Sequence, residues 1–130
     1  ERPSAVSVGN PHLVFFVNDV DAVPLDTLGP EIEHDPLFPE RINVNVAQIL
    51  SRNAIKLRVW ERGAGLTLAC GTGACATATA AYRQGLVDGE VTVRLPGGTL
   101  TIRHDAEGGI HMAGPAQESY RGTFELDHFS

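Results

Sequence analysis

The sequence is poor in cysteine, methionine and basic residues, and it lacks a long apolar run. Its ten lysines and arginines are outnumbered by sixteen aspartates and glutamates, which gives a formal net charge of −6. A protein that binds the phosphate backbone of DNA or RNA needs a patch of lysine and arginine. No apolar run approaches the roughly 20 residues that span a bilayer. These absences exclude a nucleic-acid-binding protein and predict no association with membranes.

The two cysteines, Cys70 and Cys75, are close in sequence but badly placed to form a disulfide. On one helix their spacing separates them by about 140° around the axis, whereas a disulfide needs Cβ atoms roughly 4 Å apart. The spacing also differs from that of zinc knuckles and of thioredoxin-like redox pairs. We therefore expect free thiols, no metal site and a cytoplasmic location, where thiols stay reduced.

The chain is long enough for one compact domain and too short for two. Its 130 residues predict a single domain over residues 1–130. The sequence begins ERPSAV, without an initiator methionine, and its one methionine is Met112. We expect it to be a piece of a longer protein.

Alternating and apolar segments predict strands both before and after a single helix. Ala54–Glu61 alternates most regularly, because Ile55, Leu57 and Val59 share one side. In Ile42–Leu50 the apolar residues Ile42, Val44 and Val46 share one side. Pro24–His34 predicts short or broken helices, since Gly29-Pro30 interrupts it. Further predicted strands are Ser4–Val8, Leu13–Val17, Glu90–Leu95, Thr99–His104, Ile110–Ala113 and Thr123–Leu126, with a hairpin at Pro96-Gly97-Gly98.

The predicted helix, from about Gly71 to Arg83 and closed by Gly85, is unusual in composition. Ala74–Ala81 has no charged side chain on any side, and a helix that is apolar all round is a buried one. Its residues are small, so strands can approach its backbone closely. The fold class predicted is α+β, with an antiparallel, strongly curved β-sheet wrapped around one buried central helix.

Cys70 lies where this helix begins, beside the glycine-rich turn Gly71-Thr72-Gly73. A helix N-terminus favours negative charge, so it stabilises a thiolate and can hold a ligand carboxylate. Two other interpretations remain open: Cys70 as a small buried hydrophobic residue, or the turn as a phosphate loop. The glycine-rich turn lacks the lysine that a phosphate-binding loop carries. Cys75, within the alanine run, is expected to pack in the core.

Four segments together resemble the diaminopimelate epimerase family. They are Gly9-Asn10-Pro11-His12, Phe38-Pro39-Glu40-Arg41-Ile42-Asn43-Val44, Arg58-Val59-Trp60-Glu61-Arg62-Gly63-Ala64-Gly65 and Ala69-Cys70-Gly71-Thr72-Gly73-Ala74-Cys75. They occur in the family's order and spacing over nearly the whole chain, but they correspond to only the C-terminal half of that enzyme. The resemblance implies that the N-terminal half is absent.

The resemblance implies a reaction that inverts the α-carbon of LL-diaminopimelate to give the meso form, in lysine and peptidoglycan precursor biosynthesis. No metal or cofactor takes part. One cysteine from each of two similar domains moves a proton on opposite faces of the α-carbon. Cys70 is then one catalytic thiol and the missing domain carries the other, so we expect the isolated chain to be inactive. Gly71 and Thr72 would bind the reacting α-carboxylate.

The same resemblance assigns the other site residues. His12 would be the polar partner of the missing domain's cysteine, and Glu61 that of Cys70. The substrate's non-reacting end would be held by Asn10, Asn43, Glu61 and Arg62. Each of these residues has an ordinary structural interpretation as well, as a turn, strand-end or core residue.

Two alternative functions stay open from the sequence. One is another amino-acid racemase or isomerase with the same paired-domain fold, and the other is a non-catalytic domain that binds a carboxylate at the helix N-terminus. Many members of the family have glutamate where this chain has Leu66, which we expect to alter hydrogen bonding in the turn. The resemblance also implies a homodimer.

Overall fold

The computed structural model describes residues 4–7, 11–25, 28, 31, 43–61, 65–67, 71–114, 118–122 and 127–129. Side chains are described for residues 12–25, 28, 31, 43–60 and 71–114. The elements are β1 (Ser4–Ser7), β2 (Pro11–Phe16), the 3₁₀ helix η1 (Val20–Ala22), β3 (Asn43–Ser51), β4 (Ala54–Glu61), β5 (Gly65–Thr67), α2 (Gly71–Arg83), β6 (Glu90–Leu95), β7 (Gly98–His104), β8 (Ile110–Ala113), β9 (Glu118–Gly122) and β10 (Asp127–Phe129).

These elements form an α+β fold, and the predicted positions of most of them are confirmed. The predicted bounds of α2, β6 and β8 are those of the structure, and β6 pairs with β7 as the predicted hairpin. The predicted strand Thr123–Leu126 and most of Pro24–His34 lie outside the described residues. Among the described residues, α2 and the shorter helical segments do not reach the length and apolar content needed to cross a membrane.

The strands form one mixed sheet, so the prediction of an antiparallel sheet is wrong. Their order is β10-β1-β2-β3-β4-β6-β7-β8-β9, and β5 pairs with the end of β4. The pairs β2–β3 and β4–β6 are parallel. Parallel neighbouring strands need a long crossover connection. Residues 17–42 connect β2 to β3, and the segment with β5 and α2 connects β4 to β6. The sheet is not closed, because no pairing joins β9 to β10 within the described residues.

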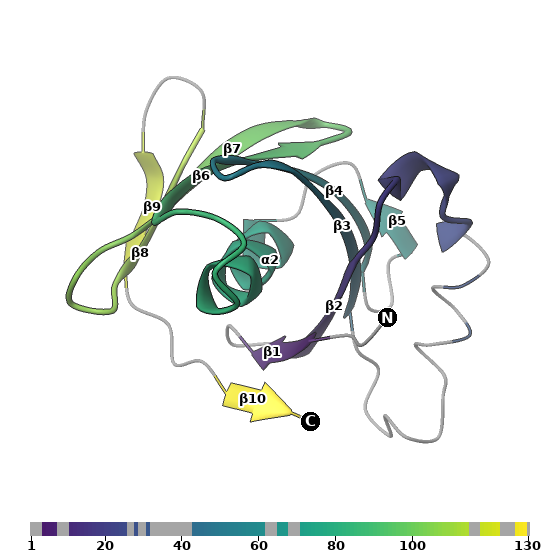
Figure 1. The fold of residues 1–130 in the computed structure, drawn as a ribbon, viewed down its shortest axis with the longest axis horizontal. Coiled ribbons are helices and arrows are strands. Elements are labelled where there is room, and N and C mark those ends of the chain that lie inside the picture. The colour runs from purple at the N-terminus through teal and green to yellow at the C-terminus, as the bar shows by residue number, and fades with distance from the viewer. Residues whose placement is uncertain are drawn as a thin grey trace.

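Helix α2 packs on one face of this sheet (Figure 1) and contacts β1, β2, β3, β4, β6, β7 and β8. Residues Ala74–Ala81 are at most 2% exposed, which confirms that the middle of the helix is buried on every side. Cys75 is completely buried among them, as expected for a packing residue. Alanine and threonine leave little side-chain volume between the helix backbone and the strands, so the sheet can approach closely.

The end of α2 is closed by Gly85, as predicted. Its φ is +75°, a left-handed conformation that costs glycine least. The Gly85 N–H donates to the Tyr82 carbonyl at 3.1 Å, and the Leu86 N–H donates to the Ala81 carbonyl at 2.9 Å. This pair of bonds is the Schellman motif, which satisfies carbonyls at the end of a helix.

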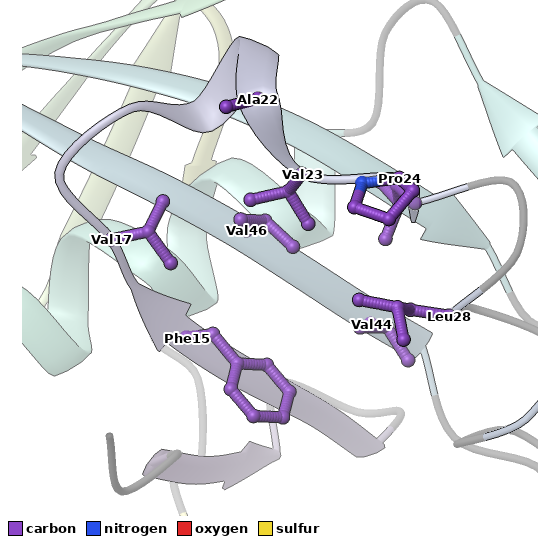
Figure 2. Close-up of a pocket in the computed structure, with 9 residues that line it drawn as sticks. Phe15, Val17, Ala22, Val23, Pro24, Leu28, Val44 and Val46 are labelled. Carbon is purple, nitrogen blue, oxygen red and sulfur yellow. The ribbon is translucent and has the colours of Figure 1, made fainter.

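The opposite face of the sheet carries a second, smaller apolar cluster. Val44 and Val46 of β3 point away from α2 and pack with Val20 and Leu25. A pocket of about 290 Å³ lies beside them (Figure 2). Every residue that lines it is apolar: Phe15, Val17, Ala22, Val23, Pro24, Leu25, Leu28, Val44 and Val46.

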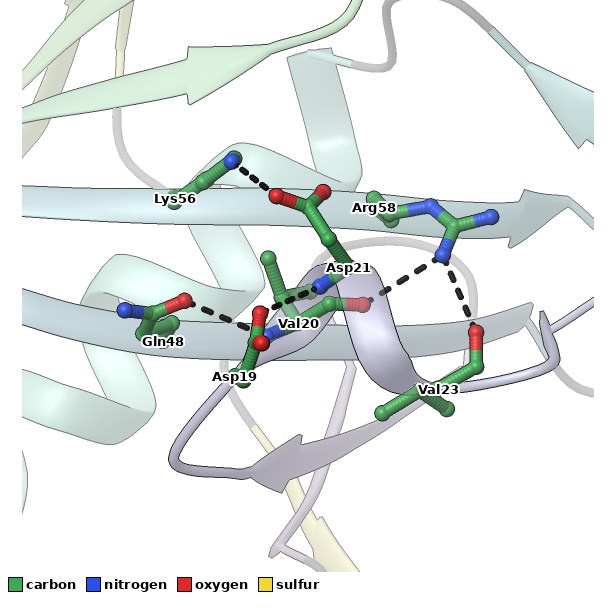
Figure 3. Close-up of polar contacts among 7 residues, drawn as sticks. All are labelled: Asp19, Val20, Asp21, Val23, Gln48, Lys56 and Arg58. Atoms are coloured by element: carbon green, nitrogen blue, oxygen red, sulfur yellow. Dashed lines mark hydrogen bonds and ion pairs between the residues drawn. The ribbon is translucent and has the colours of Figure 1, made fainter.

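Polar side chains on the same face fix the segment around η1 (Figure 3). Gln48 Oε1 accepts from the Val20 N–H at 3.1 Å. Arg58 Nη1 donates to the carbonyls of Val20 at 3.3 Å and Val23 at 3.0 Å. The Asp19 carboxylate accepts from the Asp21 N–H, as an N-cap does. Both faces of the central strands are therefore covered.

Candidate functional site

The structure describes part of the predicted site. His12, Asn43, Gly71 and Thr72 are described with their side chains, and Glu61 is described by its backbone as the last residue of β4. The other three predicted site residues, Asn10, Arg62 and Cys70, lie outside the described residues.

His12 and Asn43 lie side by side near the first residues of two neighbouring parallel strands. They are register partners in the β2–β3 pair, and their exposed fractions are 0% and 2%. Val14 and Ala47, on the same faces of these strands, belong to the core around α2. Because side chains alternate along a strand, His12 and Asn43 are on the α2 side of the sheet.

The backbone of Glu61 ends at the same edge. The last antiparallel pair between β3 and β4 is Val44 with Trp60, and Asn43 and Glu61 are the next residues of the two strands. Glu61 is in turn paired with Gly65 of β5. Three strands thus bring His12, Asn43 and the Glu61 backbone to one end of the sheet.

Asn45 fixes the imidazole of His12. Its Nδ2 is 2.9 Å from His12 Nδ1 and donates to the Leu13 carbonyl at 3.0 Å. A carbonyl only accepts, so the Asn45 atom between these two partners is the amide nitrogen. Its second hydrogen points to His12 Nδ1, which must then be the acceptor. The proton of the neutral ring is therefore on Nε2.

The start of α2 is packed against β8. A Cβ built on Gly71 would be 3.0 Å from Met112 Sδ and 3.1 Å from Met112 Cε, so glycine lets the first turn approach that side chain. Gly71 and Thr72 are half-buried, and the first turn carries no acidic residue. The positive end of the helix dipole is therefore not compensated by the helix's own first turn.

The chain ties this helix start to the strand edge that carries Glu61. Thr67 of β5 pairs with Val59 of β4, and α2 begins four residues later. Four residues span at most roughly 14 Å. Gly71 is therefore held within that distance of Thr67, the last residue of β5.

Two other histidines lie on β7 and β8, away from β2. His104 Nε2 and Thr79 Oγ1 form a 2.9 Å hydrogen bond, and the ring stacks on Tyr82 with 4.6 Å between centroids. Burial lowers the pKa of His104, and Arg83 lowers it further, against a raising effect of the Gly89 backbone and Asp105. These contacts join α2 to β7.

His111, on β8, donates to a carboxylate. Its Nε2 is 2.8 Å from Asp105 Oδ2. Asp105 Oδ1 accepts from the N–H groups of Gly109 at 2.7 Å and Glu107 at 3.0 Å. The hydrogen bond from His111, followed by those from the backbone, lowers the pKa of Asp105 to about 2. This pair organises the turn between β7 and β8.

A sequence model of diaminopimelate epimerase matches residues 4–118 of this chain. The chain belongs to the diaminopimelate epimerase family. Among curated relatives, the diaminopimelate epimerase of Erythrobacter litoralis is 66% identical over 130 residues and that of Sphingopyxis alaskensis is 60% identical over 129. The matches cover 100% and 99% of this chain but 48% of each relative. The chain thus spans about half the length of these epimerases.

Solved structures share the fold at low sequence identity. A phenazine biosynthesis protein of the PhzF family from Enterococcus faecalis aligns with a TM-score of 0.64 and 15% identity, over 85% of this chain and 44% of that one. A PhzF-family protein from Bacillus anthracis aligns with a TM-score of 0.56 and 19% identity, over 85% of this chain and 37% of that one. These likenesses support the architecture alone.

The apolar pocket of Figure 2 is separate from the epimerase-family site residues. Val44 and Val46 line it (Figure 2). Because side chains alternate along β3, they point to the face opposite Asn43 and Asn45. Small-molecule sites need a few placed polar groups, and the lining side chains offer none. In the described part of the chain, no three His, Cys, Asp or Glu side chains gather as they do around a metal ion.

The sequence reasoning missed Asn45 and the contact of Met112 with Gly71. A signal for Asn45 was available, because Ile42, Val44 and Val46 were predicted on one side of a strand. That alternation places Asn43 and Asn45 together on the other side. No comparable signal connects Met112 with the helix start, since the pairing of distant segments decides that contact.

Proposed function

We propose that this chain supplies one half of the active site of a diaminopimelate epimerase. The observation that carries the proposal is the family match over residues 4–118, with relatives of that name that are 66% and 60% identical. The buried, adjacent side chains of His12 and Asn43 support it. The reaction is inversion at the α-carbon of LL-diaminopimelate without a cofactor.

In this proposal Cys70 is one proton-transfer group, and a cysteine of the other half is the second. Removal of the α-proton places negative charge on the adjoining carboxylate, which the N-terminus of α2 at Gly71 and Thr72 would stabilise. Inversion needs an acid and a base on opposite faces. Cys75 is buried in the core and is therefore not that second group.

The remaining roles follow the family resemblance. His12 assists the thiol of the other half and Glu61 assists Cys70, while Asn10, Asn43 and Arg62 hold the distal end of the substrate. Residues 1–130 form one domain whose sheet curves around α2. We expect the isolated chain to be inactive, because the second catalytic thiol belongs to the other half of the enzyme. Homodimer formation and a cytoplasmic location remain predictions.

The test is epimerase activity of the longest natural chain that contains this sequence, with two single variants. Cys70→Ala removes the proposed acid/base thiol and is expected to abolish conversion of LL- to meso-diaminopimelate. Cys75→Ala is the matched control, because it deletes a buried thiol of the same helix and should retain activity. Loss of activity in both variants or in neither contradicts the role of Cys70.

A further inference from the structure

The hydrogen bonds of Asn45 to His12 have a chemical consequence beyond packing. Asn45 is completely buried, and its amide nitrogen bridges His12 Nδ1 and the Leu13 carbonyl. If Nδ1 of His12 carried a proton, two N–H groups would point at each other. Rotation of the amide would relieve that clash but would place its oxygen against the Leu13 carbonyl. Both bonds therefore hold His12 in one ring orientation with the proton on Nε2.

The carbonyl oxygen of the Asn45 side chain indicates that this residue does more than stabilise the fold. Its Oδ1 is buried and has no hydrogen-bond partner among the described residues. A buried acceptor without a partner destabilises the folded protein. An apolar residue at position 45 would avoid that cost, since the neighbouring Val14 and Ala47 are core residues. What asparagine adds at this place is control of the His12 ring.

We propose that Asn45 is a positioning residue that sets the tautomer and orientation of His12, so that Nε2–H is the group presented to the reaction. The inference deepens the proposed function and rests on it for its catalytic part. Asn45 acts through His12 and does not itself contact the substrate. Exchange of its amide for a carboxylate reverses the polarity at Nδ1, because a carboxylate accepts a proton that an amide N–H excludes.

The experiment combines ring-nitrogen NMR with kinetics on the full natural chain. Two-bond ¹H–¹⁵N correlations report which ring nitrogen is protonated, and the His12 signal is assigned by its loss in His12→Phe. We expect Nε2–H in the parent and a protonated Nδ1 in Asn45→Asp. The kcat of Asn45→Asp should fall roughly 10- to 100-fold, with KM little changed. Losses of this size follow when the hydrogen-bond partner that fixes a histidine tautomer is altered.

Two further variants keep the test decisive. Asn45→Ala, which serves if Asn45→Asp does not fold, should give a mixture of both tautomers. Val14→Ala truncates the register partner of Asn45 in the β2–β3 pair, and it should leave the proton on Nε2. A protonated Nδ1 in the parent, or an unchanged tautomer in both Asn45 variants, overturns the proposal.

Kinetic results separate this inference from the proposed function. A changed tautomer with an unchanged kcat overturns the catalytic role of Asn45 while the epimerase assignment stands. A parent without diaminopimelate turnover overturns the proposed function and the catalytic part of the inference. In that case the NMR result still decides whether Asn45 sets the His12 ring.

Discussion

His12 is completely buried and His104 is half-buried in the same sheet, and their surroundings have different chemistry. His12 on β2 receives a hydrogen bond from the Asn45 amide and lies beside Asn43, a predicted substrate contact. His104 on β7 bonds to Thr79 of α2 and stacks on Tyr82 of the same helix. The neighbours of His12 fix the position of its ring proton, whereas the His104 ring connects α2 to β7. The partners of each ring, rather than burial alone, distinguish the predicted functional histidine from the structural one.

The largest contrast is expected when each ring is replaced by one without nitrogen. In the full natural chain, His12→Phe should lower kcat roughly 100- to 10,000-fold, the usual contribution of a positioned acid or base. His104→Phe keeps an aromatic ring against Tyr82 and should leave kcat close to that of the parent. The measurement is the rate of meso-diaminopimelate formation. Similar losses in both variants would contradict the comparison.

A smaller effect is expected in the dependence of stability on pH. Burial lowers the pKa of His104 below its ordinary 6.5, so the unfolded chain binds a proton more readily than the folded chain. Its contribution to stability is complete above pH 6.5 and is lost as the pH falls below that value. The unfolding free energy of His104→Phe should therefore fall less than that of the parent between pH 7 and 5. The measurement is urea unfolding across this pH range. A parent and variant with parallel curves would refute it.

The smallest effect is expected at the His111–Asp105 pair, and only in strong acid. The folded pKa of Asp105 is lowered from 3.8 to about 2. Its contribution is therefore present above pH 3.8 and disappears as the pH falls toward 2. Asp105→Asn keeps an oxygen for the N–H groups of Gly109 and Glu107 but cannot titrate. Its unfolding free energy should fall less than that of the parent in this window. An equal fall in both would contradict the pairing.

Local patterns predicted the elements of this fold well and their partners less well. The uncharged run Ala74–Ala81 predicts a buried helix, and α2 is one. Alternation in Ala54–Glu61 predicts β4, but it does not say which strands lie beside it. The parallel pairs β2–β3 and β4–β6 depend on crossovers. Their direction is decided by the packing of distant segments, which no local pattern reports.

The sequence predicted which residues form the candidate site better than it predicted which of them are in contact. Family motifs pointed to His12 and Asn43, and the structure makes them register partners. The bond from Asn45 to His12 joins residues 33 positions apart, so it becomes visible only when the strand register is known. Cys70, Arg62 and Asn10 lie outside the described residues, and their roles stay predictions.

The central claim, that this chain is half of an epimerase site, is tested most directly by proton NMR in D₂O. The full natural chain is mixed with LL-diaminopimelate, and the α-proton signal is followed over time. We predict that the signal disappears as meso product forms, because one thiol removes the α-proton and the opposite thiol, deuterated by the solvent, delivers a deuteron. An α-proton signal that persists with well-folded protein would contradict the account.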